Sequence, residues 1–217
     1  MIGDILKKRA QEMGLVLSGE NISAIELYVG ELKKWNSKVN LTAITADEEI
    51  VVKHIIDSLV ITAHVHDGEN VLDIGSGAGL PAIPLKIVKP KVSVVSVDAV
   101  GKKILFQRHV ARLLKFNGFE ALHARVESMQ ESSARRFDVI TSRAFSQLQQ
   151  FVGLAAPLLA VGGRMIAMKG PAAIEEMKEA EDLLLNLGFE ISAIHSYKLP
   201  LNAGERNLIV IVPCERA

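Results

Sequence analysis

The stretch that most constrains the fold of this chain is residues 71–81, which read Val-Leu-Asp-Ile-Gly-Ser-Gly-Ala-Gly-Leu-Pro. Its first four residues predict a buried strand that carries one acid, Asp73, and a helical pattern begins at Leu80. A strand, a tight glycine turn and a helix N-terminus typically form a ligand site on which backbone N–H groups converge. The spacing G-x-G-x-G differs from the G-x-G-x-x-G of dinucleotide-binding folds. A plain strand-to-helix connection stays open as the alternative, because glycine turns also serve that purpose.

The charge balance excludes a strong overall field for nucleic acid, because 25 Lys and Arg residues are matched by 25 Asp and Glu residues. Binding of RNA or DNA would therefore require a local basic patch. Cys214 is the only cysteine, which excludes an internal disulfide and suits a reducing cytoplasm. The sequence shows neither a signal-peptide pattern nor an apolar run long enough to span a membrane, so we expect a cytoplasmic protein with no membrane segment.

Residues 1–66 carry a helical pattern and no strand pattern. Ile25, Val29, Leu32 and Trp35 recur at helical spacing, a turn is predicted at residues 36–42, and a second amphipathic helix follows Asp47. We therefore expect a helical N-terminal cap over residues 1–66 and a Rossmann-like domain over residues 67–217. The two should form one compact unit.

From residue 70 onward, short β-rich runs alternate with helical ones, which is typical of βαβ units and a parallel sheet with helices on both faces. The predicted strands are 71–74, 92–98, 119–123, 137–142, 164–168, 190–199 and 207–212, and the helices are 80–88, 102–116, 147–159 and 172–187. The link at residues 200–206 is too short for a helical crossover, so the last two strands should pair antiparallel. The prediction is an α/β fold with a seven-stranded, mostly parallel sheet that ends in an antiparallel hairpin.

Ligands of open parallel sheets bind at the carboxyl ends of the strands, so the residues that follow each strand are the candidates. The second predicted strand ends at Asp98, whose carboxylate can accept hydrogen bonds from the ribose hydroxyls of a nucleoside. The alternative is a solvent-facing loop acid. The third strand is followed by residues 123–127, which can hold a nucleobase. A surface ion pair between Arg125 and Glu127 is an equal alternative there.

The fourth predicted strand ends in Ser142-Arg143-Ala144-Phe145. Enzymes that methylate an exocyclic amine usually carry an Asn/Asp-Pro-Pro-aromatic turn at this position, whose oxygens polarise the amine. A guanidinium accepts neither a proton nor a hydrogen bond, but it can grip phosphate or a base edge. Arg143 therefore favours a nucleophile that already has a free lone pair, and no general base is expected.

Basic residues at strand ends predict a basic mouth around the glycine turn, despite the zero net charge. Arg143 and Lys169 end parallel strands at one rim, Arg206 comes from the hairpin link, and Lys102 opens the helix after the second strand. The candidates for contacts with RNA are Lys102, Arg125, Lys169 and Arg206.

Two further groups of residues have plainer interpretations. Arg108, Arg112 and Lys115 share one helix face, a pattern that usually marks a solvated surface. His54 and Asp57 lie three residues apart, but no second His or Cys stands at ligand spacing, so no metal site is predicted. A lone His on a mixed helix face is more often structural.

Several short motifs together resemble one family. In chain order they are Trp35-Asn36, Asn40-Leu41-Thr42, Lys53-His54-Ile55-Ile56-Asp57-Ser58, residues 73–81, Arg125-Val126-Glu127, Ser142-Arg143-Ala144, Lys169-Gly170 and Gly204-Glu205-Arg206. This combination resembles the glucose-inhibited division protein B family of bacterial small-subunit ribosomal RNA methyltransferases, from about residue 25 to about residue 212. The resemblance implies a class I fold that uses S-adenosyl-L-methionine to methylate N7 of one guanine in 16S rRNA.

The resemblance also assigns roles to positions of this chain. It places Gly75 and Leu80 at cofactor contacts, Val126 and Glu127 beside the adenine, and Arg143 between cofactor and substrate. The complete predicted cofactor set is Asp73, Gly75, Gly77, Gly79, Leu80, Asp98, Val126, Glu127 and Arg143. Asn40, His54 and Asp57 are expected to be site-forming. After Gly170 the chain departs from the family pattern, because Pro171-Ala172-Ala173 replaces a more polar segment.

Two other functions stay open from the sequence. One is an NAD(P)-dependent oxidoreductase, which the glycine spacing and the C-terminal hairpin disfavour. The other is a non-catalytic RNA-binding module with a methyltransferase fold, which the zero net charge and the 5% aromatic content disfavour. The expected partner is 16S rRNA, as naked RNA or within a small-subunit particle, and the expected state is a monomer.

Overall fold

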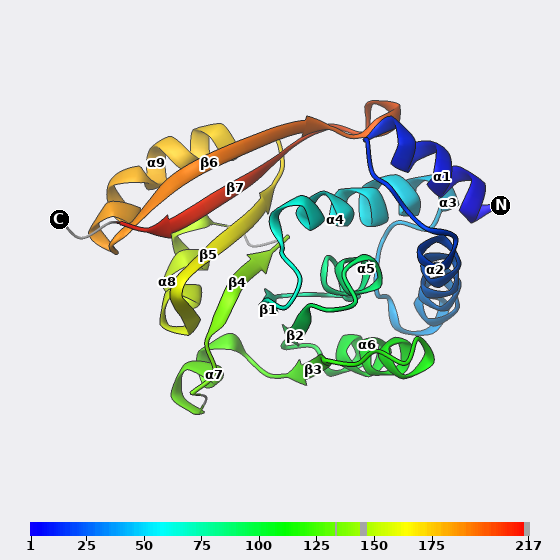
Figure 1. The fold of residues 1–217 in the computed structure, drawn as a ribbon, viewed down its shortest axis with the longest axis horizontal. Coiled ribbons are helices and arrows are strands. Elements are labelled where there is room, and N and C mark those ends of the chain that lie inside the picture. The colour runs from blue at the N-terminus through cyan, green and yellow to red at the C-terminus, as the bar shows by residue number, and fades with distance from the viewer. Residues whose placement is uncertain (133, 144–146, 215–217) are drawn as a thin grey trace.

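A computed structural model describes residues 1–132, 134–143 and 147–214. Its centre is a seven-stranded sheet with the order β3-β2-β1-β4-β5-β7-β6 (Figure 1). The strands are β1 (Asn70–Ile74), β2 (Ser93–Asp98), β3 (Phe119–His123), β4 (Phe137–Ser142), β5 (Leu159–Lys169), β6 (Phe189–Lys198) and β7 (Glu205–Pro213). The first five strands run parallel, and β7 pairs antiparallel with both β5 and β6. The predicted seven-stranded sheet with an antiparallel C-terminal hairpin is confirmed.

Helices cover both faces of the sheet. They are α1 (Ile2–Glu12), α2 (Gly19–Val39), α3 (Asp47–Ile50), α4 (Asp57–Leu59), α5 (Ala82–Val88), α6 (Gly101–Leu113), α7 (Val126–Ser132), α8 (Leu148–Ala155) and α9 (Ala173–Asn186). Successive strand residues point to opposite faces. Leu72 therefore packs in the core under α8 and α9, whereas Val71 packs in the core under α5. A strand buried on both faces needs the continuous apolar run that the sequence supplies.

The order of the strands creates a switch point beside β1. The chain moves outward from β1 through β2 to β3, and then returns to place β4 on the other side of β1. The connections after β1 and β4 therefore diverge at the carboxyl edge of the sheet and open a crevice there. The glycine turn follows β1 and lies at this edge.

The N-terminal helices share one core with the sheet domain. Helix α2 begins at Ser18, whose side chain forms a reciprocal capping box with Asn21. Tyr28 of α2 lies in the same buried cluster as Ile83 of α5 and Phe106 of α6. The N-terminal helices therefore pack as part of a continuous apolar core.

The turn predicted at residues 36–42 begins too early, because α2 continues to Val39 and ends at Asn40. The Asn36 side chain accepts hydrogen bonds from the N–H groups of Leu41 and Thr42 at 2.6 and 2.9 Å. A residue that favours turns thus sits inside the last helical turn and caps the chain that follows.

Other elements also differ from the prediction. The predicted helix at residues 147–159 ends at Ala155, where a short 3₁₀ helix with Pro157 near its start follows, because proline provides no N–H to continue an α-helix. Residues 126–132 form α7, a helix that was not among those predicted. Most consequential, residues 51–56 form a π-helical turn between α3 and α4 in place of regular α-helix.

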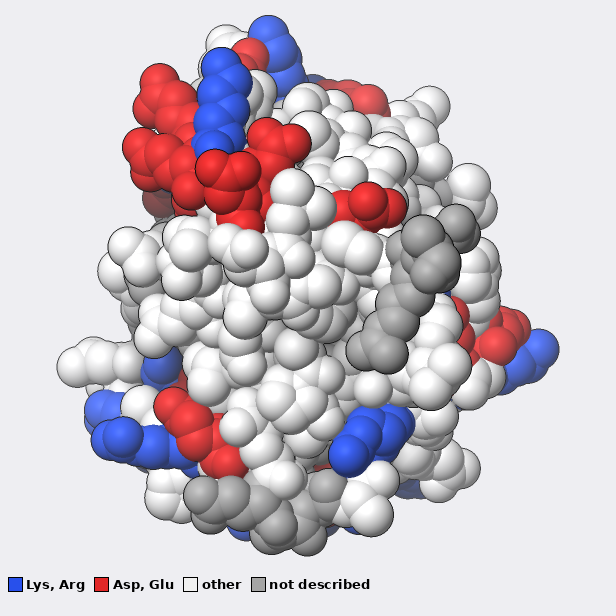
Figure 2. All heavy atoms as spheres, turned by 90° about the vertical axis from the view of Figure 1, so that its left-hand side faces the viewer, with Lys and Arg blue, Asp and Glu red and all other residues white. Residues whose placement is uncertain are grey.

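Acidic side chains gather at one end of the molecule (Figure 2). Helix α6 and helix α9 lie at opposite ends in Figure 1. Figure 2 faces the α9 end and shows acidic side chains gathered along its upper edge. Among the described residues, no helix is long and apolar enough to cross a bilayer.

Candidate active site

A cleft of about 280 Å³ opens at the carboxyl ends of β1, β2 and β3. Its walls include five of the residues predicted to lie at the site, namely Gly75, Asp98, Arg125, Val126 and Glu127. Arg125 and Glu127 both line this cleft, and no ion pair between them is present in the described structure. The alternative of a surface ion pair is therefore wrong for these two residues.

The backbone N–H groups of the glycine turn do not point at an open site, which corrects the first expectation from the sequence. Gly75 and Ser76 donate to the carbonyl of Val97 at 2.9 and 3.2 Å. Gly77 donates to Oδ2 of Asp98 at 2.8 Å. These three N–H groups therefore bind the turn to the end of β2, so they stabilise the fold and are not available to a ligand.

The absence of a Cβ has different consequences at different glycines of the turn. Gly75 has φ +71°, and a Cβ built there would meet no atom within 4 Å, so its backbone forms an open wall of the cleft. At Gly79, by contrast, a Cβ would overlap the side chain of Ile83. Leu80 is buried in the core shared with the N-terminal helices. Gly75 therefore faces the cleft, whereas Gly79 and Leu80 face the core.

A buried glutamine supports the turn from behind. Gln107 of α6 is fully buried, and its Nε2 donates to Oγ of Ser76 and to the carbonyl of Gly77, each at 2.8 Å. Its Oε1 accepts from Oγ of Ser96 at 2.5 Å. All these polar groups are satisfied inside the protein, so the network holds the turn in one conformation. Sequence reasoning missed Gln107, although a glutamine on the apolar face of a helix was a visible signal.

A tyrosine of the N-terminal helices holds the next residue of the turn. The hydroxyl of Tyr28, a fully buried residue of α2, donates to the carbonyl of Ala78 at 2.9 Å. The two residues lie 50 positions apart in the chain. The N-terminal helices therefore help to shape the glycine turn directly.

Asp73 leaves one polar atom without a partner. Its carboxylate is completely buried; Oδ2 accepts from the N–H of Ala82 at 3.2 Å, and Oδ1 has no hydrogen bond. Burial raises the pKa of Asp73 to about 8. An unpartnered buried carboxylate oxygen next to a glycine turn marks a place where a ligand donor would be stabilised.

Asp98 has a structural role in addition to its place in the cleft. Oδ1 accepts from the N–H of Val100 and Oδ2 from the N–H of Gly77, each at 2.8 Å. The Nζ of Lys103 lies 3.7 Å from Oδ2. Because a carboxylate offers about two acceptor sites on each oxygen, Asp98 keeps acceptor capacity for a ligand hydroxyl. It is not the solvent-facing loop acid of the alternative interpretation, since it is 7% exposed.

Arg143, at the end of β4, is held by the π-helical turn. Its Nη1 donates to the carbonyl of Lys53 at 2.8 Å and to Oδ2 of Asp57 at 3.3 Å. Its Nη2 lies 3.3 Å from Nδ1 of His54. π-Helical turns recur at functional sites because they redirect side chains from a regular helix. Ala144 and Phe145 of the predicted motif lie outside the described residues.

Asp57 also contacts two side chains of the C-terminal hairpin. Its Oδ1 accepts from the hydroxyl of Tyr197 at 2.9 Å and lies 3.8 Å from Nε of Arg206. One buried carboxylate thus joins Arg143 and Arg206, which come from β4 and β7. Tyr197, which no sequence pattern singled out, belongs to this group. We call Asp57, Arg143, Tyr197 and Arg206 the Asp57 cluster.

His54 is neutral in this arrangement. Because a guanidinium can only donate, Nδ1 of His54 is assigned as the acceptor from Arg143 and Nε2 as the donor to Oγ1 of Thr42 at 2.7 Å. Burial, followed by the charge of Arg143, lowers the pKa of His54 to about 4. The lone pair of His54 is therefore already engaged, so this residue is not a free base.

Lys169 joins the same edge of the sheet. It ends β5 opposite Asn207 of β7, the residue after Arg206, and its Nζ lies 2.8 Å from Oε1 of Glu176. The three cations of the predicted basic mouth, Arg143, Lys169 and Arg206, therefore lie at the carboxyl edge of the sheet, and the placement of this mouth around the glycine turn stays a prediction. Asp57 and Glu176 partly neutralise these cations.

The other predicted positions lie apart from this mouth. Lys102 is exposed at the start of α6, and Arg125 follows β3 beside the cleft. Asn40 ends α2 and lines a separate pocket of about 470 Å³, which it shares with Asn36 and Thr42. Within the described residues, no three His, Cys, Asp or Glu side chains gather in a way that could hold a metal ion.

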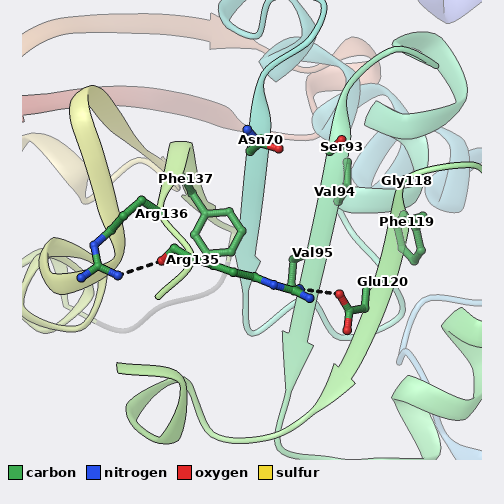
Figure 3. A pocket seen from close by; sticks show the side chains of 10 residues that line it. All are labelled: Asn70, Ser93, Val94, Val95, Gly118, Phe119, Glu120, Arg135, Arg136 and Phe137. Carbon is green, nitrogen blue, oxygen red and sulfur yellow. Dashed lines mark hydrogen bonds and ion pairs between the residues drawn. The ribbon is translucent and has the colours of Figure 1, made fainter. Parts of the chain in front are cut away.

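A larger cavity of about 470 Å³ lies at the opposite edge of the sheet (Figure 3). Asn70, Ser93, Phe119 and Phe137, the first residues of four strands, line it. An ion pair of 2.5 Å between Arg135 and Glu120 crosses its mouth. Ligands of parallel sheets bind at the carboxyl ends of strands, so this cavity is not the candidate active site.

The fold recurs in solved structures. The ribosomal protein L11 methylase from Lactobacillus delbrueckii subsp. bulgaricus has a TM-score of 0.59 and 17% identity, over 75% of this chain and 79% of that chain. Fibrillarin from Aeropyrum pernix, determined with natively bound S-adenosyl-L-methionine, has a TM-score of 0.56 and 17% identity over 72% and 74% of the two chains. At this identity the likeness concerns the fold alone.

Sequence comparison is more specific. A protein from Geobacter sp. strain M21 named ribosomal RNA small subunit methyltransferase G is 48% identical over 208 residues, which cover 96% of each chain. A protein of the same name from Geobacter sulfurreducens is 47% identical over 210 residues, or 97% of each chain. The GidB family model, described as rRNA small subunit methyltransferase G, matches residues 21–209. With the sheet order, the glycine turn and the Asp57 cluster in place, this chain belongs to the GidB family of rRNA small subunit methyltransferases.

Proposed function

We propose that this protein transfers a methyl group from S-adenosyl-L-methionine to N7 of a guanine in 16S ribosomal RNA. The observation that carries the proposal is the way in which Arg143 is held. Arg143 follows β4, the strand that pairs with β1, and Lys53, His54 and Asp57 all hold its guanidinium in place. The site therefore offers positive charge and hydrogen-bond donors.

The residues around the cleft fit S-adenosyl-L-methionine. The wall at Gly75 is open where any other residue would place a Cβ, and Asp73 has a buried oxygen without a donor. Asp98 would hold the ribose hydroxyls, and Val126 and Glu127 would border the adenine. When bound, the cofactor supplies an electrophilic methyl group on a sulfonium.

The substrate side suits a nucleophile that needs no deprotonation. Guanine N7 carries a lone pair in the plane of the ring, so methylation there requires positioning and electrostatics more than proton transfer. His54 is neutral and its Nδ1 lone pair is taken by Arg143, so this histidine offers no free base next to the guanidinium. Arg143 positions the target by donating to guanine O6 or to a phosphate.

Contacts with RNA are assigned to the basic residues. Lys169 and Arg206 would contact phosphates near the target nucleotide, and Lys102 and Arg125 would contact RNA beside the cofactor cleft. Methylation at N7 makes the purine ring cationic, so these groups would approach phosphate or O6 and avoid the ring face. A target guanine that is stacked in the RNA would be turned out at a cost of a few kcal/mol.

The remaining expectations belong to the same proposal. The protein acts in the cytoplasm as a monomer, and residues 1–66 and 67–217 work as one compact unit. The core that Tyr28 shares with Ile83 and Phe106 supports this last point, because neither part has that apolar cluster to itself.

A methyl-transfer assay tests the function. The protein would be incubated with methyl-labelled S-adenosyl-L-methionine and either unmodified 16S rRNA or small-subunit particles, and the RNA would be cleaved with aniline at N7-methylguanine. Label at one guanine in at least one of the two substrates is the expected result. Label at another base, or at an exocyclic nitrogen, would contradict the proposal.

Two further measurements on the same protein distinguish the proposed function from the two competing functions. An oxidoreductase would bind NAD(P) in preference to S-adenosyl-L-methionine in a direct titration. A non-catalytic module would bind RNA but transfer no methyl group in a single-turnover experiment. Either result would replace the proposed function.

A further inference from the structure

Helix α6 carries a concentration of positive charge, and the cations of its second half have no part in the candidate active site. Residues Gly101–Leu113 contain four cations, Lys102, Lys103, Arg108 and Arg112, and no acid. Lys115 follows directly after the helix. Arg108, Arg112 and Lys115 stand at spacings of four and three, which places them on one face, and all three are exposed.

These three cations differ from most other arginines of the chain. Among the described residues, none of the three has a carboxylate within 4 Å. In contrast, five arginines pair with a carboxylate elsewhere in the protein, namely Arg9, Arg135, Arg143, Arg164 and Arg206. The chain has as many acids as bases, yet none of its described acids pairs with these three cations. A cationic face without internal counter-charges favours an anionic partner.

The face is shaped as a groove of about 400 Å³. The rings of Phe116 and Phe119, 5.5 Å apart, form an apolar part of its wall, and the three cations line it. Arg108 is fixed there because its Nε donates to the carbonyl of Ala121 at 2.9 Å. This bond leaves the two terminal nitrogens of Arg108 for a ligand, and a guanidinium can grip a phosphate with two of its donors.

The opposite end of the molecule has the reverse charge. Helix α9 contains five acids and one lysine. The acidic side chains gathered at that end are visible in Figure 2, and α6 lies at the other end of the sheet in Figure 1. A polyanion would therefore be attracted to the α6 end and repelled from the α9 end, although the net charge is zero.

We propose that Arg108, Arg112 and Lys115 form a second RNA-contact surface, which binds the phosphodiester backbone of the substrate RNA away from the methylated nucleotide. We call it the α6 surface. Helix α6 begins near the cofactor cleft, because it follows Asp98 closely, and is about 20 Å long; the α6 surface lies along its second half and just beyond its end. Its cations would contact phosphates and not base edges, so this surface would orient the RNA without recognising its sequence. Selection of the guanine would depend on the Asp57 cluster. The inference rests on the proposed function.

The test compares two charge-matched double variants of the full chain. Arg112→Gln with Lys115→Gln removes two cations of the α6 surface. Lys7→Gln with Lys8→Gln removes two exposed cations from α1 and is the control. Binding to a 16S rRNA transcript would be measured between low and moderate salt, together with methyl transfer to transcript and to small-subunit particles.

The α6 variant should bind the transcript more weakly, with a salt dependence that is smaller by roughly 1.5 in log–log slope, since each lost phosphate contact removes about 0.7–0.9. Its KM for RNA should rise, while kcat at saturating RNA and the affinity for S-adenosyl-L-methionine stay at wild-type values. The Lys7/Lys8 control should keep the wild-type slope.

Three results would overturn the α6 surface. These are an unchanged slope, an equal loss in the Lys7/Lys8 control, or a loss seen only with particles, which would indicate a protein partner. A failure of the proposed function would look different, because wild-type protein would then transfer no methyl group to either substrate.

Discussion

Asp57 accepts a hydrogen bond from Arg143 at 3.3 Å, although 86 positions separate the two residues in the chain. The first lies just after the π-helical turn of the N-terminal region, and the second ends a central strand of the sheet. The same carboxylate also meets Tyr197 and Arg206 from the C-terminal hairpin. Three distant parts of the sequence are thus brought to one buried acid, and the position of both guanidinium groups depends on it.

Replacing Asp57 by Asn should uncouple the two arginines. The amide keeps the shape of the side chain but removes the negative charge that faces both guanidinium groups. We expect a loss of about 1–3 kcal/mol in the free energy of unfolding, and a fall in methyl transfer on the order of 100-fold because Arg143 moves. Urea unfolding and single-turnover methylation measure the two effects, and the affinity for S-adenosyl-L-methionine should change little. Wild-type turnover in this variant would remove Asp57 from the positioning of Arg143.

Tyr197→Phe is the matched control for Asp57. It removes one hydrogen bond from the same carboxylate and leaves both ion pairs in place. Stability should fall by about 0.5–1.5 kcal/mol, with methylation within a few-fold of wild type. If Tyr197→Phe and Asp57→Asn reduced activity equally, general packing around the cluster would explain the loss, and not charge.

Alanine substitutions at Gly75 and at Gly79 should give opposite results. In Gly75→Ala the new methyl group would project into open space at φ +71°, so it occupies the cleft wall, and the backbone strain costs about 1–2 kcal/mol. In Gly79→Ala the methyl group would overlap Ile83 in the core. We expect the first variant to stay folded and lose cofactor affinity, and the second to lose mainly stability. Calorimetric titration with S-adenosyl-L-methionine and thermal unfolding separate the two; unchanged affinity in Gly75→Ala would argue against the cleft assignment.

Gln107→Leu tests the support behind the glycine turn. The change removes the buried hydrogen-bond partner of the Ser76 hydroxyl, the Ser96 hydroxyl and the carbonyl of Gly77. Each unsatisfied group costs about 1–3 kcal/mol, so we expect marked destabilisation and weaker cofactor binding. Tyr28→Phe removes a single bond to Ala78 and should do the same to a smaller extent. Binding curves measured well below the unfolding temperature decide the matter, and wild-type affinity in both variants would show that the turn needs no such support.

His54 should make stability depend on pH. Its pKa is lowered from 6.5 to about 4 in the folded protein, chiefly by burial. Below about pH 6.5, His54 is therefore protonated in the unfolded chain but still neutral in the folded chain. The contribution of neutral His54 to the free energy of unfolding is fully present above that pH. It is lost as the pH falls towards 4, by up to roughly 3 kcal/mol. Urea unfolding between about pH 7 and pH 5 should show a smaller slope for His54→Gln than for wild type; equal slopes would contradict the neutral, buried assignment.

The sequence was sufficient for the parts of the fold that depend on local periodicity. The strands at 119–123 and 137–142 were predicted to the residue, and the antiparallel hairpin followed from the length of one link. Asp98, Val126 and Glu127 could be placed at the cleft because parallel strands deliver their carboxyl ends to one edge.

What could not be predicted depends on contacts between distant segments. No local pattern reveals that Tyr28 reaches Ala78, or that Tyr197 reaches Asp57. The N–H groups of the glycine turn were expected to meet a ligand, but Val97 and Asp98 of the neighbouring strand use them first. A π-helical turn has the same apolar spacing as an α-helix over so few residues, so the pattern at 47–60 could not distinguish them.

The π-helical turn makes the number of residues before Asp57 matter as much as their identity. An α-helix advances by about 100° for each residue. Deleting any single residue among 51–56 would restore regular winding and rotate Asp57 around the axis, away from Arg143, even if every remaining side chain were kept. Insertions and deletions in this short segment are therefore far less tolerable than conservative exchanges, and chain length here is itself a functional quantity.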